Sequence, residues 1–397
     1  MDPQALNKLL SPSGQQVLAE AMERAPRRED FLRDFTALSR KYPNELARSA
    51  VETAILRREA VKKFPQAQKM YFTREALEQA TGAEVAAYRA ERYRSFRQAV
   101  DLGCSIGGDS LTLARHIPTL GIDLDLLRLK LAAANAQALS LNDETAFVQA
   151  DLYSWLPVRY SVDTALFFDP TRRSRERRAH HVWQYQPPLE VVNRWLGYFP
   201  AMGVKISPGV DLEELRTFDA EVEFISVSGE LKEAVLWFGP LKTAARRATL
   251  LPGPFSMVAK TLANDVSVHL SEPLHYIYEP DPAVMRAGLV RLLAQQLGAA
   301  QLDEDIAYLT SASYQPSPFA RAWEIETWLP FNLKRLRDLL RQRKVGRVTV
   351  KKRGSPLEPE ALVRDLRLKG DQERVIFLTH FMGKPIVILA IPGLVKK

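Results

Sequence analysis

The chain has 397 residues, of which 46% are hydrophobic and 26% charged, values typical of a globular protein with two or three domains. No segment approaches the run of about 18–20 apolar residues that spans a membrane, and no apolar signal-peptide core follows the N-terminus. The single cysteine excludes an intrachain disulfide and a multi-cysteine zinc site. We therefore expect a cytoplasmic protein with no membrane partner and no bound metal.

The positive charge of the chain is concentrated in its C-terminal part. The formal net charge is +8, and residues 321–397 hold 18 Lys+Arg against 8 Asp+Glu, a net of +10, so that the remainder sums to −2. A compact basic module favours a polyanionic partner such as nucleic acid. A solvated basic face without a partner is the alternative reading of the charge alone.

The first 95 residues predict a helical region. Apolar residues recur at helical spacing, as in Phe31, Phe35 and Leu38. Asn44 and Thr73 are the expected N-caps of two of these helices. Phe72 lies in a segment that passes close to the ligand site expected below, so it is a candidate substrate contact.

From residue 99 the sequence alternates between short apolar runs and helical patterns. We expect strands at 99–102, 119–122, 146–149, 164–168 and 203–206, followed by two closely spaced strands at 221–227 and 233–238. Continuous apolar strands separated by helices predict a buried parallel sheet, whereas the last two are too close for a helical crossover and should be antiparallel. The fold class is therefore α/β.

Two further regions follow this sheet. Residues 241–320 predict a small α+β unit, with strand candidates at 257–262 and 266–270 and a helix at 283–297. Residues 321–397 read as strand, helix, strand, helix and hairpin, with the helices at 332–344 and 358–368.

A small-residue loop follows the first predicted strand, and an acid lies at or after the end of each of the first four. Gly103, Ser105 and Gly107 form a turn in which a ligand can approach the backbone, and Asp109 could cap the helix that follows. The four acids are Asp101, Asp123, Asp151 and Asp169. Because ligands of open α/β sheets bind at the carboxyl ends of the strands, these side chains predict one nucleotide-type site.

This arrangement resembles the class I S-adenosylmethionine-dependent methyltransferases, with their Rossmann-like seven-stranded core. The resemblance implies that Asp101, Gly103, Ser105 and Gly107 hold the methionine part of the cofactor, with Ser105 standing where the family has its middle glycine. It implies further that Asp123 binds the ribose and Asp151 the adenine amine, while Leu124 and Leu152 enclose the ring. NAD is the alternative cofactor.

The fourth strand ends in Asp169-Pro170-Thr171-Arg172-Arg173. It is similar to the Asp/Asn-Pro-Pro-aromatic motif of amine-methylating relatives, which implies that Asp169 and Pro170 orient the target amine. Arg172 and Arg173 open an arginine-rich loop that we expect to contact phosphates. Cys104 lies in the cofactor loop, so no cysteine is left for covalent attack on a pyrimidine ring.

The segment 70–81, the Asp-Pro-x-Arg-Arg motif and the tail resemble bacterial methyltransferases with a C-terminal THUMP-like domain, a module that elsewhere binds structured RNA. The tail places Lys351, Lys352 and Arg353 at a strand end, where they are candidate RNA contacts. The expected domains are a helical region at 1–95, the methyltransferase core at 96–240, a ferredoxin-like unit at 241–320 and the THUMP-like domain at 321–397. The expected function is methylation of structured RNA (tRNA or rRNA) at a base nitrogen. The alternatives are a small-molecule or protein methyltransferase, and an RNA-binding protein with a degenerate core.

Overall fold

The structure, a computed structural model, describes residues 1–154, 156–170, 181–261 and 267–393. It divides into two compact units. The first comprises Met1–Glu221 and Glu233–Thr243, and the second comprises Val222–Lys232 and Ala244–Lys397. No helix among the described residues has the length and apolar character needed to cross a membrane.

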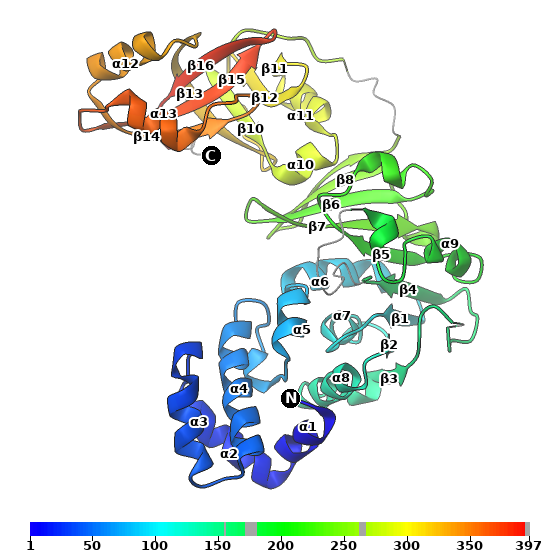
Figure 1. The fold of residues 1–397 in the computed structure, drawn as a ribbon. Coiled ribbons are helices and arrows are strands. Elements are labelled where there is room, and N and C mark those ends of the chain that lie inside the picture. The colour runs from blue at the N-terminus through cyan, green and yellow to red at the C-terminus, as the bar shows by residue number, and fades with distance from the viewer. Residues whose placement is uncertain (155, 171–180, 262–266, 394–397) are drawn as a thin grey trace. The chain divides into compact units, whose positions relative to one another are not determined.

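The first unit begins with a helical region, drawn in blue in Figure 1. Its helices are α1 Pro3–Leu10, α2 Pro12–Glu23, α3 Phe31–Ser39, α4 Asn44–Ala60, α5 Arg74–Gln79 and α6 Ala83–Ala90. Thr73 caps α5 as predicted, because its Oγ1 accepts a 3.2 Å hydrogen bond from the Ala76 amide. The prediction for Asn44 is wrong, since Pro43 holds the cap position and Asn44 is the first helical residue.

A sheet follows, and its first five strands are parallel where they pair with one another. The elements are β1 Gln98–Leu102, α7 Gly108–Leu113, β2 Thr119–Asp123, α8 Leu126–Ala138, β3 Thr145–Gln149, β4 Thr164–Phe168, α9 Val191–Leu196, β5 Met202–Ile206, β6 Glu221–Val227, β7 Glu230–Phe238, β8 Arg246–Leu251 and β9 Phe255–Ala259. The strand order is β3-β2-β1-β4-β5-β7-β6-β8-β9. The two closely spaced strands β6 and β7 are neighbours in this order, and β7 runs antiparallel to β5. Strand β4 is buried along its whole length because it lies inside the sheet, whereas the edge strand β3 is partly exposed.

The turn between β1 and α7 differs in one respect from the prediction. Gly107 is the N-cap of α7, with a positive φ of 82° that suits glycine. Asp109 therefore lies inside the first turn and does not cap the helix. Its carboxylate instead forms an ion pair with the buried Arg89 of α6.

The region at 241–320 contributes strands to two sheets. Strand β8 pairs in parallel with β6, and β9 pairs antiparallel with β8. The strand expected at 266–270 is absent from residues 267–270, where the structure has only an isolated bridge from Leu270 to Gln301. The helix expected at 283–297 is two helices, α10 Pro282–Arg286 and α11 Val290–Leu297, because Gly288 takes a positive φ of 73° between them.

The second unit contains a seven-stranded sheet of order β11-β12-β10-β13-β16-β15-β14. Its elements are β10 Tyr276–Pro280, β11 Ala300–Asp303, β12 Ile306–Ser311, β13 Ala320–Pro330, α12 Leu333–Gln342, β14 Val345–Lys352, α13 Pro359–Leu366, β15 Gln372–Phe381 and β16 Lys384–Ala390. Alternate residues of β15 enter different cores: Phe377 packs with β10–β13, and Ile376 packs under α12 and α13. This order of strand, helix, strand, helix and hairpin from residue 320 confirms the pattern read from the sequence.

Candidate active site

The carboxyl ends of β1, β2 and β4 meet at one edge of the parallel sheet. The loop after β1 is tied to the end of β2, since the amides of Gly103 and Cys104 both donate to the Ile122 carbonyl, at 2.8 and 3.0 Å. Gly103 has a φ of 83°, and a Cβ at this position would lie 3.1 Å from the carbonyl oxygen of Asp169. The loop therefore runs close to the end of β4, where the positive φ and the nearby carbonyl both favour glycine.

Ser105, the residue that replaces the family's middle glycine, takes the backbone conformation of a glycine. Its φ is 51°, in the left-handed region. The Ser105 amide donates a 2.8 Å hydrogen bond to Oδ2 of Asp123. Its Oγ is buried and has no hydrogen-bond partner within the described structure. An unsatisfied buried hydroxyl at this loop fits a polar ligand that supplies the missing partner.

Asp101 is buried beneath this loop. Its Oδ2 accepts a 2.5 Å hydrogen bond from the Ser110 hydroxyl at the start of α7. Burial, reinforced by the neighbouring Asp109 carboxylate, raises the pKa of Asp101 to about 8. An acid held close to its neutral form becomes an ionised partner when a positive charge binds beside it.

Asp123 ends β2 and stands nine-tenths buried at the sheet edge. Its carboxylate accepts the hydrogen bond from the Ser105 amide described above. Its Oδ1 also accepts a 2.9 Å hydrogen bond from the Asp125 amide. Asp151 follows β3 and is exposed, with Oδ1 accepting from the Tyr153 amide at 2.9 Å. Both acids keep lone pairs that can accept hydrogen bonds from hydroxyl or amine groups.

The two leucines expected to enclose the adenine differ in their surroundings. Leu152 is buried, whereas Leu124 is 65% exposed. An exposed leucine beside a buried one at the ends of adjacent strands offers apolar surface that a flat ring can cover.

The end of β4 carries an interaction that sequence reasoning missed. Lys205 of β5 is 5% exposed at its side chain, and its Nζ lies 2.6 Å from Oδ2 of Asp169 and 2.9 Å from Oγ1 of Thr81. Pro170, predicted beside Asp169, is buried at the end of the strand. The sequence did contain one indication of this pair, a lysine within the apolar run of β5. A buried ammonium needs an acidic partner, and the acids at the strand ends were the candidates.

A second buried ion-pair network lies near this pair. Arg89 pairs with Asp109 and, at 3.2 Å, with Glu233 of β7, and its guanidinium lies over the Phe167 ring. Burial raises the pKa of Glu233. Acids outnumber bases in this region, which suits a ligand with positive charge.

The structure does not place three of the predicted substrate contacts, Phe72, Arg172 and Arg173, at an accessible surface. Phe72 is 1% exposed and packs against Phe64 with ring centroids 5.6 Å apart, so its ring belongs to the helical core and is not exposed for stacking. Arg172 and Arg173 lie outside the described residues. The described residues contain no group of three or more His, Cys, Asp or Glu side chains suited to a metal ion.

The predicted basic cluster belongs to the second unit and is largely paired. Lys351 Nζ lies 2.6 Å from Glu279, Lys352 Nζ lies 2.7 Å from Glu358, and Arg353 is 3.8 Å from Glu279. These cations are therefore held in place by carboxylates and do not form an open positive face.

The chain is similar to a described domain family, to curated proteins and to solved structures. A family model described as THUMP domain-like matches residues 320–392, and a domain of unknown function matches residues 2–60. An uncharacterized S-adenosylmethionine-dependent methyltransferase of Mycobacterium tuberculosis, present in two strains, is 36% identical over 342 residues, which are 83% of this chain and 92% of the relative. A solved structure of a candidate methyltransferase from Porphyromonas gingivalis W83 has a TM-score of 0.74 and 21% identity, and the match covers 95% of this chain and 98% of that one.

The parallel sheet with its antiparallel β7 and the loop over its carboxyl edge define a Rossmann-like methyltransferase fold, and the structural match over almost the whole chain has the same fold. The chain belongs to the S-adenosylmethionine-dependent methyltransferases and carries a THUMP-like domain at its C-terminus. The predicted fold class, enzyme class and cofactor are thereby confirmed.

Proposed function

We propose that this methyltransferase transfers the methyl group to structured RNA, tRNA or rRNA, at a base nitrogen. The observation that carries the proposal is the THUMP-like domain at 320–392 within the tail of net charge +10. THUMP modules elsewhere bind structured RNA, and a localised positive charge attracts a polyanion. The single cysteine, buried as Cys104, suits the reducing cytoplasm where such RNA is found.

The residues we assign to the cofactor are those at the carboxyl edge of the sheet. Asp101 lies where it can face the methionine ammonium, and the loop of Gly103, Ser105 and Gly107 leaves room for the methionine chain. Asp123 is assigned to the ribose hydroxyls, because its carboxylate ends β2 beside the loop. Asp151, Leu124 and Leu152 are assigned to the adenine.

S-adenosylmethionine supplies an electrophilic methyl group on a positively charged sulfur. The protein then needs to orient the acceptor nitrogen in line with that methyl group and to exclude water. Lys205 engages Oδ2 of Asp169, so Oδ1 of the same carboxylate can accept a hydrogen bond from the target amine. Asp169 and Pro170 are therefore the assigned target-orienting residues, and Arg172 and Arg173, which follow them in sequence, are assigned to phosphate.

The test is transfer of labelled methyl groups to total RNA from cells that lack this protein, followed by nucleoside mass spectrometry. We expect RNase-sensitive label in a base-methylated nucleoside. Label in protein or in a small molecule, with none in RNA, would contradict the proposal and favour the alternative substrate classes.

The site assignment has its own test. Replacing Asp123 by Ala should weaken cofactor binding in calorimetry by roughly tenfold or more, because hydrogen bonds to a charged group contribute about 1.5–3 kcal/mol. Asp143→Ala, at an exposed acid away from the edge, is the matched control. Equal cofactor affinity for the two variants would disprove the ribose assignment.

A further inference from the structure

The second unit contains a cavity of about 750 Å³, separate from the cofactor residues, and all of its lining residues belong to that unit. The size lies within the roughly 300–1,000 Å³ of small-molecule sites. It is lined by the β6–β7 turn, the ends of β8 and β10, the loop before β13 and the end of β14.

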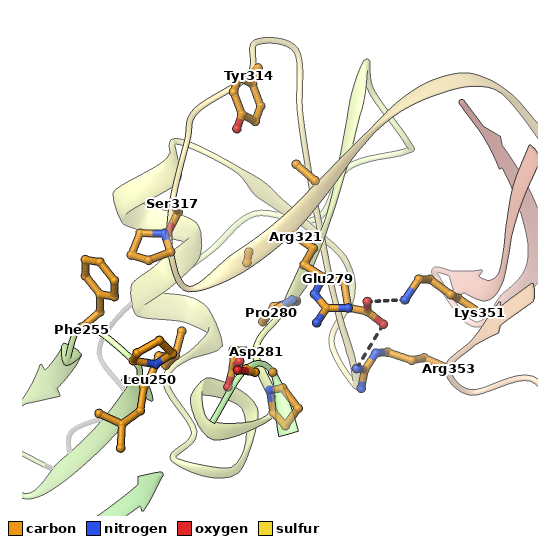
Figure 2. A pocket seen from close by; sticks show the side chains of 18 residues that line it. Leu250, Phe255, Glu279, Pro280, Asp281, Tyr314, Ser317, Arg321, Lys351 and Arg353 are labelled. Carbon is orange, nitrogen blue, oxygen red and sulfur yellow. Dashed lines mark hydrogen bonds and ion pairs between the residues drawn. The ribbon is translucent and has the colours of Figure 1, made fainter. Parts of the chain in front are cut away.

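Figure 2 shows that the lining has two different ends. Leu250 and Phe255 stand on one side, and Lys351 and Arg353 stand on the opposite side, with Arg321 between them. Phe255 is 44% exposed, so part of its ring is accessible to a ligand. The cavity therefore offers an aromatic surface at one end and cations at the other.

Two of the three cationic side chains, those of Lys351 and Arg353, form ion pairs with a carboxylate of the lining. Glu279 lies 2.6 Å from Lys351 Nζ and 3.8 Å from Arg353, as the dashed lines of Figure 2 mark. Both cations also lie over aromatic rings, Lys351 at 4.9 Å from the Trp323 centroid and Arg353 at 5.3 Å from the Tyr308 centroid. These contacts fix the positions of the two side chains.

Arg321 is different, because no described residue forms an ion pair or hydrogen bond with its guanidinium. The side chain lies against Gly229, and a Cβ on that glycine would come 2.5 Å from Arg321 Nη2. Gly229 has a φ of 83° in the β6–β7 turn, so the turn both requires glycine and leaves room for the guanidinium. Nε of Arg353 is also buried without a partner among the described residues.

A ligand that suits this lining has an anionic group for the guanidinium and a flat ring for Phe255. Guanidinium groups bind phosphate through two parallel hydrogen bonds, and exposed aromatic rings stack on nucleobases. We propose that the cavity binds one nucleoside phosphate, with its phosphate on Arg321 and its base against Phe255. This inference rests on the proposed function, in which the ligand is an unpaired nucleotide of the RNA substrate.

The experiment measures binding of a labelled single-stranded RNA tetranucleotide and of adenosine, cytidine, guanosine and uridine monophosphates to the full chain. Arg321→Ala should weaken binding by roughly tenfold or more, as expected for a lost charge-assisted hydrogen bond. It should also lower the slope of log affinity against log salt concentration by about 1. Phe255→Ala should weaken binding to the bases with little change in the salt slope.

Arg335→Ala removes the same charge from an exposed position on α12 outside the cavity and is the matched control. Gly229→Ala should weaken binding less than Arg321→Ala does, because the added Cβ shifts the guanidinium without removing its charge. Equal losses in Arg321→Ala and Arg335→Ala, or an unchanged affinity in Phe255→Ala, would overturn the proposal. Unchanged circular dichroism would show that the variants fold.

The two ligand sources give different results. Tighter binding of the tetranucleotide than of any monophosphate assigns the site to RNA, and the reverse assigns it to a free nucleotide. If no RNA accepts methyl groups while Arg321-dependent nucleotide binding persists, the proposed function fails and the cavity assignment stands. If RNA is methylated and Arg321→Ala binds like the control, the cavity assignment fails alone.

Discussion

The ammonium of Lys205 lies 2.6 Å from the carboxylate of Asp169, and both belong to strand ends at the cofactor edge. The lysine side chain is almost fully buried, whereas the side chain of the acid is one-quarter exposed. A buried ammonium is stable only beside such a carboxylate, so the charge of Lys205 is stabilised by Asp169. Lys205 in turn holds the carboxylate of Asp169 in place.

Replacing Lys205 by Met should lower the free energy of unfolding and methyl transfer together. Breaking a buried pair costs about 3–5 kcal/mol, and we expect the lower end because Asp169 keeps contact with solvent. The double variant Lys205→Met/Asp169→Asn should recover stability without activity, which urea unfolding and a transfer assay measure. Lys232→Met, in an exposed pair with Glu230, is the control and should leave the free energy of unfolding nearly unchanged. A destabilised double variant would contradict the pairing.

The pKa of Asp101 predicts a pH dependence of stability. Because burial raises this pKa from 3.8 to about 8 in the folded protein, the folded state holds a proton that the unfolded state releases. The stabilisation of the folded state by this protonated carboxyl is fully present below about pH 4. It is lost as the pH rises from there through the folded-state pKa of about 8. Asp101→Asn should therefore lose less stability than the natural chain between pH 6 and pH 9 in urea unfolding. Parallel curves for the two proteins would rule out this titration.

The left-handed backbone of Ser105 predicts that its Gly and Ala variants differ in the free energy of unfolding. A left-handed conformation costs a residue with a Cβ about 1–2 kcal/mol. Ser105→Gly should accordingly be about 1 kcal/mol more stable than Ser105→Ala, while both lose the buried Oγ and bind the cofactor a few-fold less tightly than the natural chain. Urea unfolding and calorimetry measure these quantities, and equal stability of the two variants would show that the strain is negligible.

Asn135 of α8 joins the helical region to the cofactor loop. Its side chain accepts a 2.6 Å hydrogen bond from the Tyr71 amide and donates to the carbonyls of Tyr71 and Ile106, at 3.1 and 3.0 Å. Asn135→Ala should cost about 3 kcal/mol or more, because three buried backbone groups lose their partner. Asn142→Ala, at an exposed position, should be close to neutral. Similar unfolding midpoints for both variants would contradict this role.

The sequence by itself determined the parallel core, because continuous apolar runs with small-residue loops and strand-end acids fit few other folds. It also determined the order of elements after residue 320. Local signals were less reliable where two conformations compete: Asp109 could have capped α7, but Arg89, distant in sequence, draws its carboxylate into an ion pair.

Only the tertiary structure decided which charged groups face one another. Lys205 and Asp169 are separated by 36 residues, and Lys351 and Glu279 by 72, so no local pattern relates them. The sequence counted Lys351 and Arg353 as free positive charge, whereas folding places Glu279 between them and leaves Arg321 beside Gly229 without a described partner. The composition of a segment determines how much charge it has, but the fold determines how much of that charge remains for a ligand, because electrostatic interactions depend on distance and burial.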